Sequence, residues 1–309
     1  MANSFHVPVL TKEILYYLNC KKGGVYIDCT LGGGGHSKAI LENIYPYGLL
    51  IGIDQDSEAI EVAKEELQNY IDKVKLIKGN FRNLEEVISK YKIETVSGII
   101  FDLGVSFHQL KERERGFSFK EEDRLDMRMD LLQSFNAEVL VNTYSEKALI
   151  EIFEKYGEER FSKRIARRII TERKKRAITK TKQLADLIIK MLPKYKKRHT
   201  WRIHPATRVF QAIRIEVNQE LDALEKGLKQ AIKVLDNRGR ICVISYHSLE
   251  DRIVKNIFKE TEREGLKQRK YRFKIITKKP IRPSLGEIKE NPKARSAKLR
   301  VAEKMKGEN

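Results

Sequence analysis

Short apolar runs and stretches of helical periodicity alternate through the first hundred residues. The apolar runs lie at Val25–Ile27, Leu49–Asp54, Val74–Lys78 and Gly98–Asp102. Runs of this length between turn residues are typical of strands that are buried in a parallel sheet. Between them, stretches such as Ser57–Asn69 have apolar residues every three or four positions, as amphipathic helices do. Strands that alternate with helices predict a doubly wound α/β sheet.

The next apolar run, Arg240–Ser245, comes much too late for a simple crossover. A parallel connection needs only about a dozen residues, usually one helix. Pro205–Leu235 has the spacing of one long amphipathic helix that leads into this strand. We therefore predict a core domain formed by residues 1–108 and 205–309, and an inserted domain formed by residues 109–204.

The inserted segment has helical periodicity and no strand-like alternation. Helices are predicted over Ala137–Leu140, Lys147–Tyr156, Phe161–Glu172 and Thr181–Met191. Its first part, Arg113–Asp130, is dense in charges of both signs, which favours a partner-contacting or lid-like loop over a core segment, with a plain solvated loop as the alternative.

The C-terminal part of the core is predicted from shorter signals. A helix is expected over Leu249–Thr261, and Tyr271–Thr277 with Lys298–Ala302 is a candidate hairpin.

A glycine-rich loop follows the first predicted strand. The sequence there is VYIDCTLGGGGHS, with four glycines at positions 32–35 before a predicted helix at Ser37–Asn43. Glycines let backbone N–H groups approach a ligand closely, and the helix directs its free N–H groups to the same place. The second strand ends in Asp54, where a carboxylate can accept hydrogen bonds from ribose hydroxyls. This combination predicts a site for a nucleoside-containing cofactor.

Composition adds a second expectation, a polyanionic partner. The chain has 309 residues and a net charge of +19. Arg160–Arg202 contains 17 Lys and Arg against two acids, and Gly265–Gly286 contains eight and no acid. Two basic patches beside a nucleoside site favour nucleic acid as the substrate.

The cysteines and apolar segments indicate the cellular compartment of the protein. Cys29 and Cys242 lie in strand-like runs, where a thiol is most often a core residue, and no zinc or disulfide spacing is present. We expect no metal in the site. No run has the length of a membrane span, and no secretory signal is visible. These features predict a cytoplasmic protein.

Two cofactor classes fit the first half of the chain. A dehydrogenase of the GxGxxG type would have a third glycine at position 37, which is serine here. A methyltransferase uses a looser glycine loop, an acid after the second strand and a polar loop after the fourth. The second description fits better, and its cofactor would be S-adenosylmethionine.

Seven sequence blocks resemble one family over nearly the whole chain. They are His6–Glu13, Tyr26–Ser37, Asp102–Leu110, Arg115–Phe119, Leu125–Met129, His247–Arg252 and Asn291–Glu303. In this order they resemble the bacterial ribosomal RNA small subunit methyltransferase H family. The resemblance implies a class I S-adenosylmethionine-dependent methyltransferase, a Rossmann-like sheet with an inserted α-helical domain. It also implies methyl transfer to N4 of a cytidine in the decoding region of 16S rRNA, with the assembled 30S subunit or a late precursor as partner.

The resemblance also assigns cofactor contacts to positions of this chain. It implies that Gly34, Gly35 and His36 approach the methionine end of the cofactor, and that Asp54 holds the ribose hydroxyls. Phe81 would lie against the adenine, although a core aromatic is the alternative. Asp102 and Gln109 would close the site from the loop after the fourth strand.

The catalytic groups are predicted from the chemistry of the amine. The exocyclic amine of cytosine is a weak nucleophile, which acceptors for its hydrogens can orient. Asp102 is the first candidate acceptor, although the Pro-Pro motif of many amino-methyltransferases is absent from Asp102–Val105. His247 is the second candidate, and a helix-capping role is its alternative.

Two other functions stay open at this stage. One is a DNA amino-methyltransferase with the same core, and the other is a non-catalytic RNA-binding protein. The sequence also leaves the oligomeric state open, a homodimer included.

Overall fold

A computed structural model describes residues 8–106, 109, 112, 114–191, 204–268 and 271–307. Within it the chain forms two compact units. One comprises Met1–Phe107 with Leu221–Asn309, and the other comprises His108–Glu220. Residues 192–202 of the first basic patch and residues 269–270 of the second lie outside the described residues, as do residues 6, 7, 107, 108, 110 and 113 of the other segments named from the sequence.

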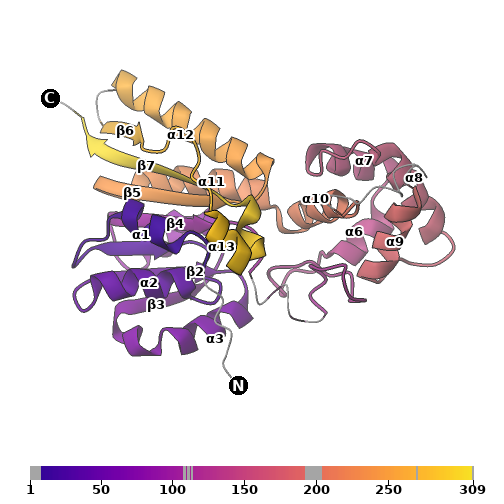
Figure 1. The fold of residues 1–309 in the computed structure, drawn as a ribbon, viewed down its shortest axis with the longest axis horizontal. Coiled ribbons are helices and arrows are strands. Elements are labelled where there is room, and N and C mark those ends of the chain that lie inside the picture. The colour runs from indigo at the N-terminus through magenta and orange to yellow at the C-terminus, as the bar shows by residue number, and fades with distance from the viewer. Residues whose placement is uncertain are drawn as a thin grey trace. The chain divides into compact units, whose positions relative to one another are not determined.

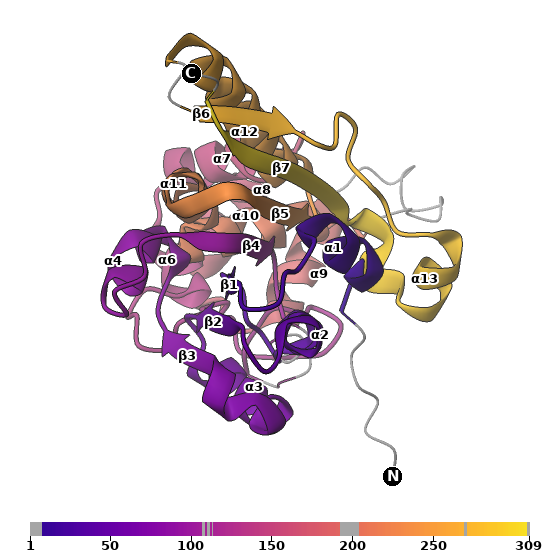
Figure 2. The same ribbon diagram turned by 90° about the vertical axis from the view of Figure 1, so that its left-hand side faces the viewer.

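The first unit is built around one seven-stranded sheet (Figures 1 and 2). Its strands are β1 (Val25–Asp28), β2 (Leu49–Asp54), β3 (Val74–Lys78), β4 (Val96–Asp102), β5 (Leu235–Ser245), β6 (Tyr271–Ile275) and β7 (Lys298–Lys306). Their order across the sheet is β3-β2-β1-β4-β5-β7-β6. Strands β1 to β5 pair in parallel, and β7 pairs antiparallel with both β5 and β6. The doubly wound sheet and the β6–β7 pairing are confirmed.

Helices flank this sheet along the chain. They are α1 (Thr11–Leu18), α2 (Gly35–Ile44), α3 (Ser57–Glu66), α4 (Leu84–Ser89), α11 (Glu220–Val234), α12 (Ser248–Gln268) and α13 (Leu285–Glu290), with the 3₁₀ segments η1 (Gln68–Lys73), η2 (Phe81–Asn83) and η4 (Pro292–Ser296). All the parallel strands have apolar residues on both faces, because helices cover both sides.

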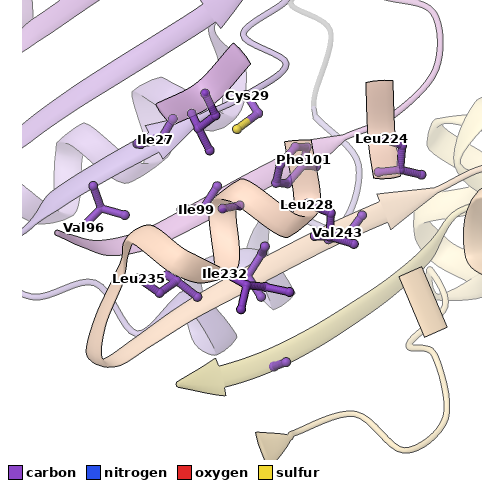
Figure 3. Packing of buried hydrophobic residues seen from close by; sticks show 14 of the residues in the cluster. Ile27, Cys29, Val96, Ile99, Phe101, Leu224, Leu228, Ile232, Leu235 and Val243 are labelled. Carbon is purple, nitrogen blue, oxygen red and sulfur yellow. The ribbon is translucent and has the colours of Figure 1, made fainter. Parts of the chain in front are cut away.

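Successive strand residues enter two different cores, since side chains alternate across a strand. Ile99 and Phe101 pack with α4, α11 and α12, whereas Ile100 packs with α1, α2 and α3. Figure 3 shows the first of these cores, with Leu228 and Ile232 of α11 beside the strand residues. The predicted core cysteines are confirmed, because Cys29 and Cys242 are buried free thiols in the two cores.

The second unit is helical, as predicted. Its helices are α6 (Ala137–Thr143), α7 (Glu146–Lys155), α8 (Ser162–Arg173), α9 (Thr181–Met191) and α10 (Thr207–Asn218). Asn136 and Ser145 cap α6 and α7 by accepting hydrogen bonds from backbone N–H groups of the first turn. The apolar faces of all five helices meet in one core.

The long helix predicted over Pro205–Leu235 is wrong. It is divided into α10 and α11 at Gln219, whose φ of +50° is left-handed, and Leu235 already belongs to β5. Because α10 packs in the helical core, the second unit ends at Glu220 and not at residue 204.

The segment 113–130 also differs from its prediction as a partner-contacting loop. Leu125 and Met127 are buried in the core of the second unit, and Met129 is buried as well. The buried charges are satisfied locally, since Arg115 donates to the carbonyl of Met129 and Asp126 accepts from Arg128. The many charged residues of this segment therefore concealed the fact that part of it is buried.

Candidate active site

The glycine loop connects β1 to α2 and is held close to its neighbours. Gly32 and Gly34 have φ values of +49° and +82°, which favour glycine. A Cβ at Gly34 would lie 3.3 Å from the Cβ of Ala63 in α3. The Leu31 N–H donates to the carbonyl of Ile53 over 3.0 Å. These contacts fix the backbone of the loop at the carboxyl ends of β1 and β2.

Asp54 braces this loop. Its Oδ2 accepts a hydrogen bond from the Gly32 N–H over 2.8 Å, and its Oδ1 accepts one from the Asp56 N–H over 2.9 Å. Burial raises the pKa of Asp54 to about 6. The carboxylate therefore organises the loop, and each of its oxygens still has a second lone pair for a ligand hydroxyl.

Ser37, which stands where a GxGxxG motif has its third glycine, makes a hydrogen bond that glycine could not make. Its hydroxyl donates to Asp28 Oδ2 over 2.8 Å, and Asp28 Oδ1 accepts from the Thr30 N–H over 3.1 Å. Asp28 is fully buried at the end of β1, and burial raises its pKa. A glycine at position 37 would leave this carboxyl without the hydroxyl partner.

His36 is a buried polar group that protein atoms leave unsatisfied. Its side chain is only 6% exposed, and neither ring nitrogen has a hydrogen-bond partner among the described residues. Its Nε2 lies 3.5 Å from Asp102 Oδ2, which is an ion-pair distance if the ring is protonated. An unsatisfied buried donor or acceptor costs about 1–3 kcal/mol, so this ring is poised to receive a polar ligand.

Asp102 is fixed at the end of β4 by hydrogen bonds to two groups. Its N–H donates to Thr30 Oγ1 over 2.6 Å, and its Oδ1 accepts from the Tyr246 hydroxyl over 2.9 Å. Burial and the neighbouring carboxylate raise the pKa of Tyr246 well above its usual value, which keeps the phenol a donor. The Asp102 side chain is 23% exposed, so it is oriented and still accessible. The structure thus brings together His36 and Asp102 from the predicted set.

Tyr246 was missed by the sequence reasoning. It immediately follows β5, whose end lies beside that of β4, where Asp102 pairs with Ile244 in register. An aromatic with a hydroxyl at that position was the available signal.

His247 lies directly before α12 and takes part in its cap. The Glu250 N–H donates to His247 Nδ1 over 3.4 Å, while Glu250 Oε2 accepts from the N–H groups of Tyr246 and His247 over 2.8 and 3.2 Å. Glu250 Oε1 is 3.1 Å from His247 Nε2. This reciprocal arrangement is a capping box, which supports the capping interpretation. The catalytic role of His247 stays a prediction.

Phe81 packs into the sheet core. Its ring meets Phe101 edge to face at a centroid distance of 5.3 Å, and a Cβ on Gly227 would approach it to 2.7 Å. These contacts fit the core-aromatic alternative, and the adenine contact stays a prediction.

Two amides that the sequence reasoning missed lie at the ends of β2 and β3. Asn80 Nδ2 donates to Gln55 Oε1 over 2.9 Å, and a Cβ on the adjacent Gly79 would meet nothing within 4 Å. Amides beside open space can serve a heterocycle with both donors and acceptors.

Gln109 belongs to the second unit, where its side chain is buried. Its predicted role in closing the cofactor site stays a prediction.

These residues fit a nucleoside cofactor with a charged tail. The glycine backbone and His36 offer polar groups without side-chain obstruction, and Asp54 offers acceptors for ribose hydroxyls. A parallel sheet with an antiparallel β7 and this loop at its carboxyl edge defines a class I methyltransferase.

The comparisons give the same class and a family. Residues 3–305 match the model of the MraW methylase family. The chain is 48% identical over 309 residues to "Ribosomal RNA small subunit methyltransferase H" of Clostridioides difficile (strain 630), covering 97% of this chain and 99% of that protein. It is 50% identical over 300 residues to the protein of the same description from Sulfurihydrogenibium sp. (strain YO3AOP1), again covering 97% and 99%. The chain belongs to the MraW methylase family and is an S-adenosylmethionine-dependent methyltransferase.

In the part of the chain that the structure describes, no helix has the length and apolar character needed to cross a membrane.

Proposed function

We propose that this protein transfers a methyl group to N4 of a cytidine in the decoding region of 16S rRNA. The observation that carries the proposal is the match of nearly the whole chain, at about half identity, to proteins described as small-subunit rRNA methyltransferases. The basic composition supports a polyanionic substrate. The target lies within folded RNA, so we infer that the assembled 30S subunit or a late precursor in the cytoplasm is the substrate.

The cofactor would be held by the glycine loop and Asp54. The backbone of Gly34 and Gly35 and the ring of His36 would lie against the methionine end, and Asp54 would accept hydrogen bonds from the ribose hydroxyls. When bound, S-adenosylmethionine supplies a methyl group on a positively charged sulfur, so no covalent enzyme intermediate is required.

Asp102 would orient the nucleophile. The cytidine must leave its stack to reach a carboxylate at the sheet edge, as bases do in enzymes that modify them. Asp102 would accept a hydrogen bond from the N4 amine. This contact would keep the lone pair of N4 available for attack on the methyl group. The hydroxyl of Tyr246 holds Asp102 Oδ1 in one orientation, which lowers the cost of organising this acceptor.

Substrate preference tests the proposal. Methyl transfer from labelled cofactor should occur on small subunits from a strain that lacks the enzyme, and not on duplex DNA. Transfer to DNA alone would instead identify a DNA amino-methyltransferase, and RNA binding without any transfer would identify a binding protein.

Cofactor affinity should fall in acid because of Asp54. Its pKa in the folded protein is raised to about 6 by burial, and ribose hydroxyls donate to the ionised form. Affinity is therefore full above pH 7 and is lost as the pH falls through 6. For a single proton the Kd should be about tenfold weaker at pH 5 than at pH 7.5.

Titration calorimetry across this range measures the effect. The Asp54→Asn variant is the control, because it removes the titrating group and leaves His36 and Asp28 in place. Equal pH dependence in the two proteins would assign the effect to another group.

The cap at α12 predicts a stability effect at His247. His247→Ala should lower the free energy of unfolding by about 1 kcal/mol, and His247→Asn should restore most of it, because asparagine is a good helix N-cap. Denaturant unfolding measures both. If alanine and asparagine are equally destabilising, the ring does not act through the cap.

The same pair of variants tests the catalytic prediction for His247. A tenfold loss of turnover in His247→Asn with intact stability would establish a catalytic role. Unchanged turnover in that variant would leave only the cap.

A further inference from the structure

A basic pocket of about 260 Å³ opens in the first unit among α12, β6 and β7. Figure 2 shows these three elements beside one another, and α12 packs on both strands. Phe258 and Ile275 supply its apolar surface, and Lys255, Lys259 and Lys278 supply its free cations. A water occupies about 30 Å³ of liquid, so the pocket has room for a hydrated ion several waters in size.

The apolar surface of the pocket is part of the sheet core. Phe258 is 1% exposed and meets Phe273 at a centroid distance of 5.6 Å within the sheet core. Since its ring face is buried, a nucleobase has no exposed aromatic surface on which to stack here.

The three lysines have no carboxylate within ion-pair distance among the described residues. Lys255 and Lys259 lie one turn apart on α12, where like charges repel, and Lys278 adds a third charge from the segment after β6. On α11, by contrast, Lys226 and Lys229 each pair with an acid one turn away. Three cations that converge from two elements on one concavity favour an anion between them.

The other charges at the pocket are already engaged. Arg300 donates to both oxygens of Asp251 over 2.7 and 3.3 Å. Burial alone would raise the pKa of Asp251, but Arg300 and Lys298 outweigh it and lower that pKa. Glu262 accepts from the Ile275 N–H over 3.0 Å. With Arg300 neutralised by Asp251, three lysines face one carboxylate, and the pocket carries a net positive charge.

We propose that this pocket seats a backbone phosphate of the RNA substrate. The proposal rests on the proposed function and adds a second contact point outside the reaction site. Lys255 is eight residues along α12 from His247, or about 12 Å at 1.5 Å per residue. An RNA strand whose target base lies at the carboxyl edge of the sheet can therefore reach the pocket within a few nucleotides. The contact reads charge and not sequence, because the pocket offers no stacking surface.

Charge removal at the pocket tests the proposal. The variant is Lys255→Gln, Lys259→Gln and Lys278→Gln in the full chain. The control is Lys64→Gln, Lys75→Gln and Lys90→Gln, which removes the same charge from α3, from β3 at the opposite edge of the sheet, and from the residue after α4. The probe is deproteinised small-subunit rRNA, titrated over a range of salt concentrations with the cofactor present.

The pocket variant should bind this RNA about tenfold more weakly at 0.1 M salt than the control. The slope of log K against log salt concentration should be shallower by about one. This is the contribution expected from the counterion that is released at one phosphate. Equal affinities and slopes in the two variants would overturn the proposal. Methyl transfer by the unmodified protein is measured separately. A pocket effect without any transfer contradicts the proposed function alone, and transfer without a pocket effect contradicts the pocket alone.

Discussion

Replacement of Asp54 by alanine is expected to weaken cofactor binding by about 100-fold or more. The carboxylate braces the glycine loop through the Gly32 N–H, and it ends β2, where we propose that the ribose binds. A hydrogen bond to a charged group contributes about 1.5–3 kcal/mol, and in the proposed site two ribose hydroxyls would use this acceptor. A loss of about 3 kcal/mol corresponds to a factor of about 100 in Kd. Titration calorimetry with S-adenosylmethionine and with its demethylated product measures the loss.

Two comparisons isolate the cause. Asp54→Asn keeps one acceptor oxygen and should lose less affinity than Asp54→Ala. Asp72→Ala, which removes a carboxylate that is 58% exposed in the same unit, should leave the Kd unchanged. If Asp54→Ala bound cofactor within threefold of the unmodified protein, the ribose assignment would be refuted.

Replacement of Asp102 by alanine is expected to reduce turnover by about 100-fold to 1,000-fold. Removing a preorganised group that stabilises the transition state has effects of this size. Asp102 Oδ1 is held by Tyr246 and its Oδ2 faces His36, so the carboxylate is fixed before the base arrives. Single-turnover methylation of small subunits at saturating cofactor measures the chemical step.

The expected pattern separates chemistry from binding. Turnover should fall far more than cofactor affinity in Asp102→Ala, because Asp54, the proposed ribose acceptor, is intact. Tyr246→Phe keeps the ring but removes one hydrogen bond to Asp102. Its turnover should lie between that of the unmodified protein and that of Asp102→Ala. Turnover above one tenth of the unmodified value in Asp102→Ala would exclude Asp102 as the main acceptor.

The parallel sheet could be predicted from the sequence because its signal is local. Strands buried on both faces read as continuous apolar runs, and β2 and β3 begin and end where the sequence predicts. The break between α10 and α11 has no such signal. Gln219 adopts a left-handed φ, which neither a glycine nor a proline marks in the sequence.

Charged side chains that are paired in the core misled the prediction for residues 113–130. The apolar residues at alternate positions, Leu125, Met127 and Met129, are buried, but the charges between them conceal this pattern. Asp126 and Arg115 are buried because backbone carbonyls and Arg128 satisfy them. Such partners become visible only when the fold is known.

The site could be predicted in part. The glycine loop and Asp54 are recognisable because each lies at the end of a predicted strand, at a spacing that is typical of nucleoside-binding sites. Tyr246 is 144 residues from Asp102 along the chain, so only the pairing of β4 with β5 brings the two together. The hydrogen bond from Ser37 to Asp28 matters because that carboxylate is buried, and the sequence does not reveal its burial.

Mapping the methylated nucleotide tests the central claim most directly. Small subunits from a strain that lacks the enzyme are incubated with this protein and methyl-labelled S-adenosylmethionine, and the rRNA is digested and analysed by mass spectrometry. The account predicts N4-methylcytidine at a cytidine of the decoding region, and its loss with Asp102→Ala. Label on another base, on rRNA outside that region, or on DNA alone would contradict it.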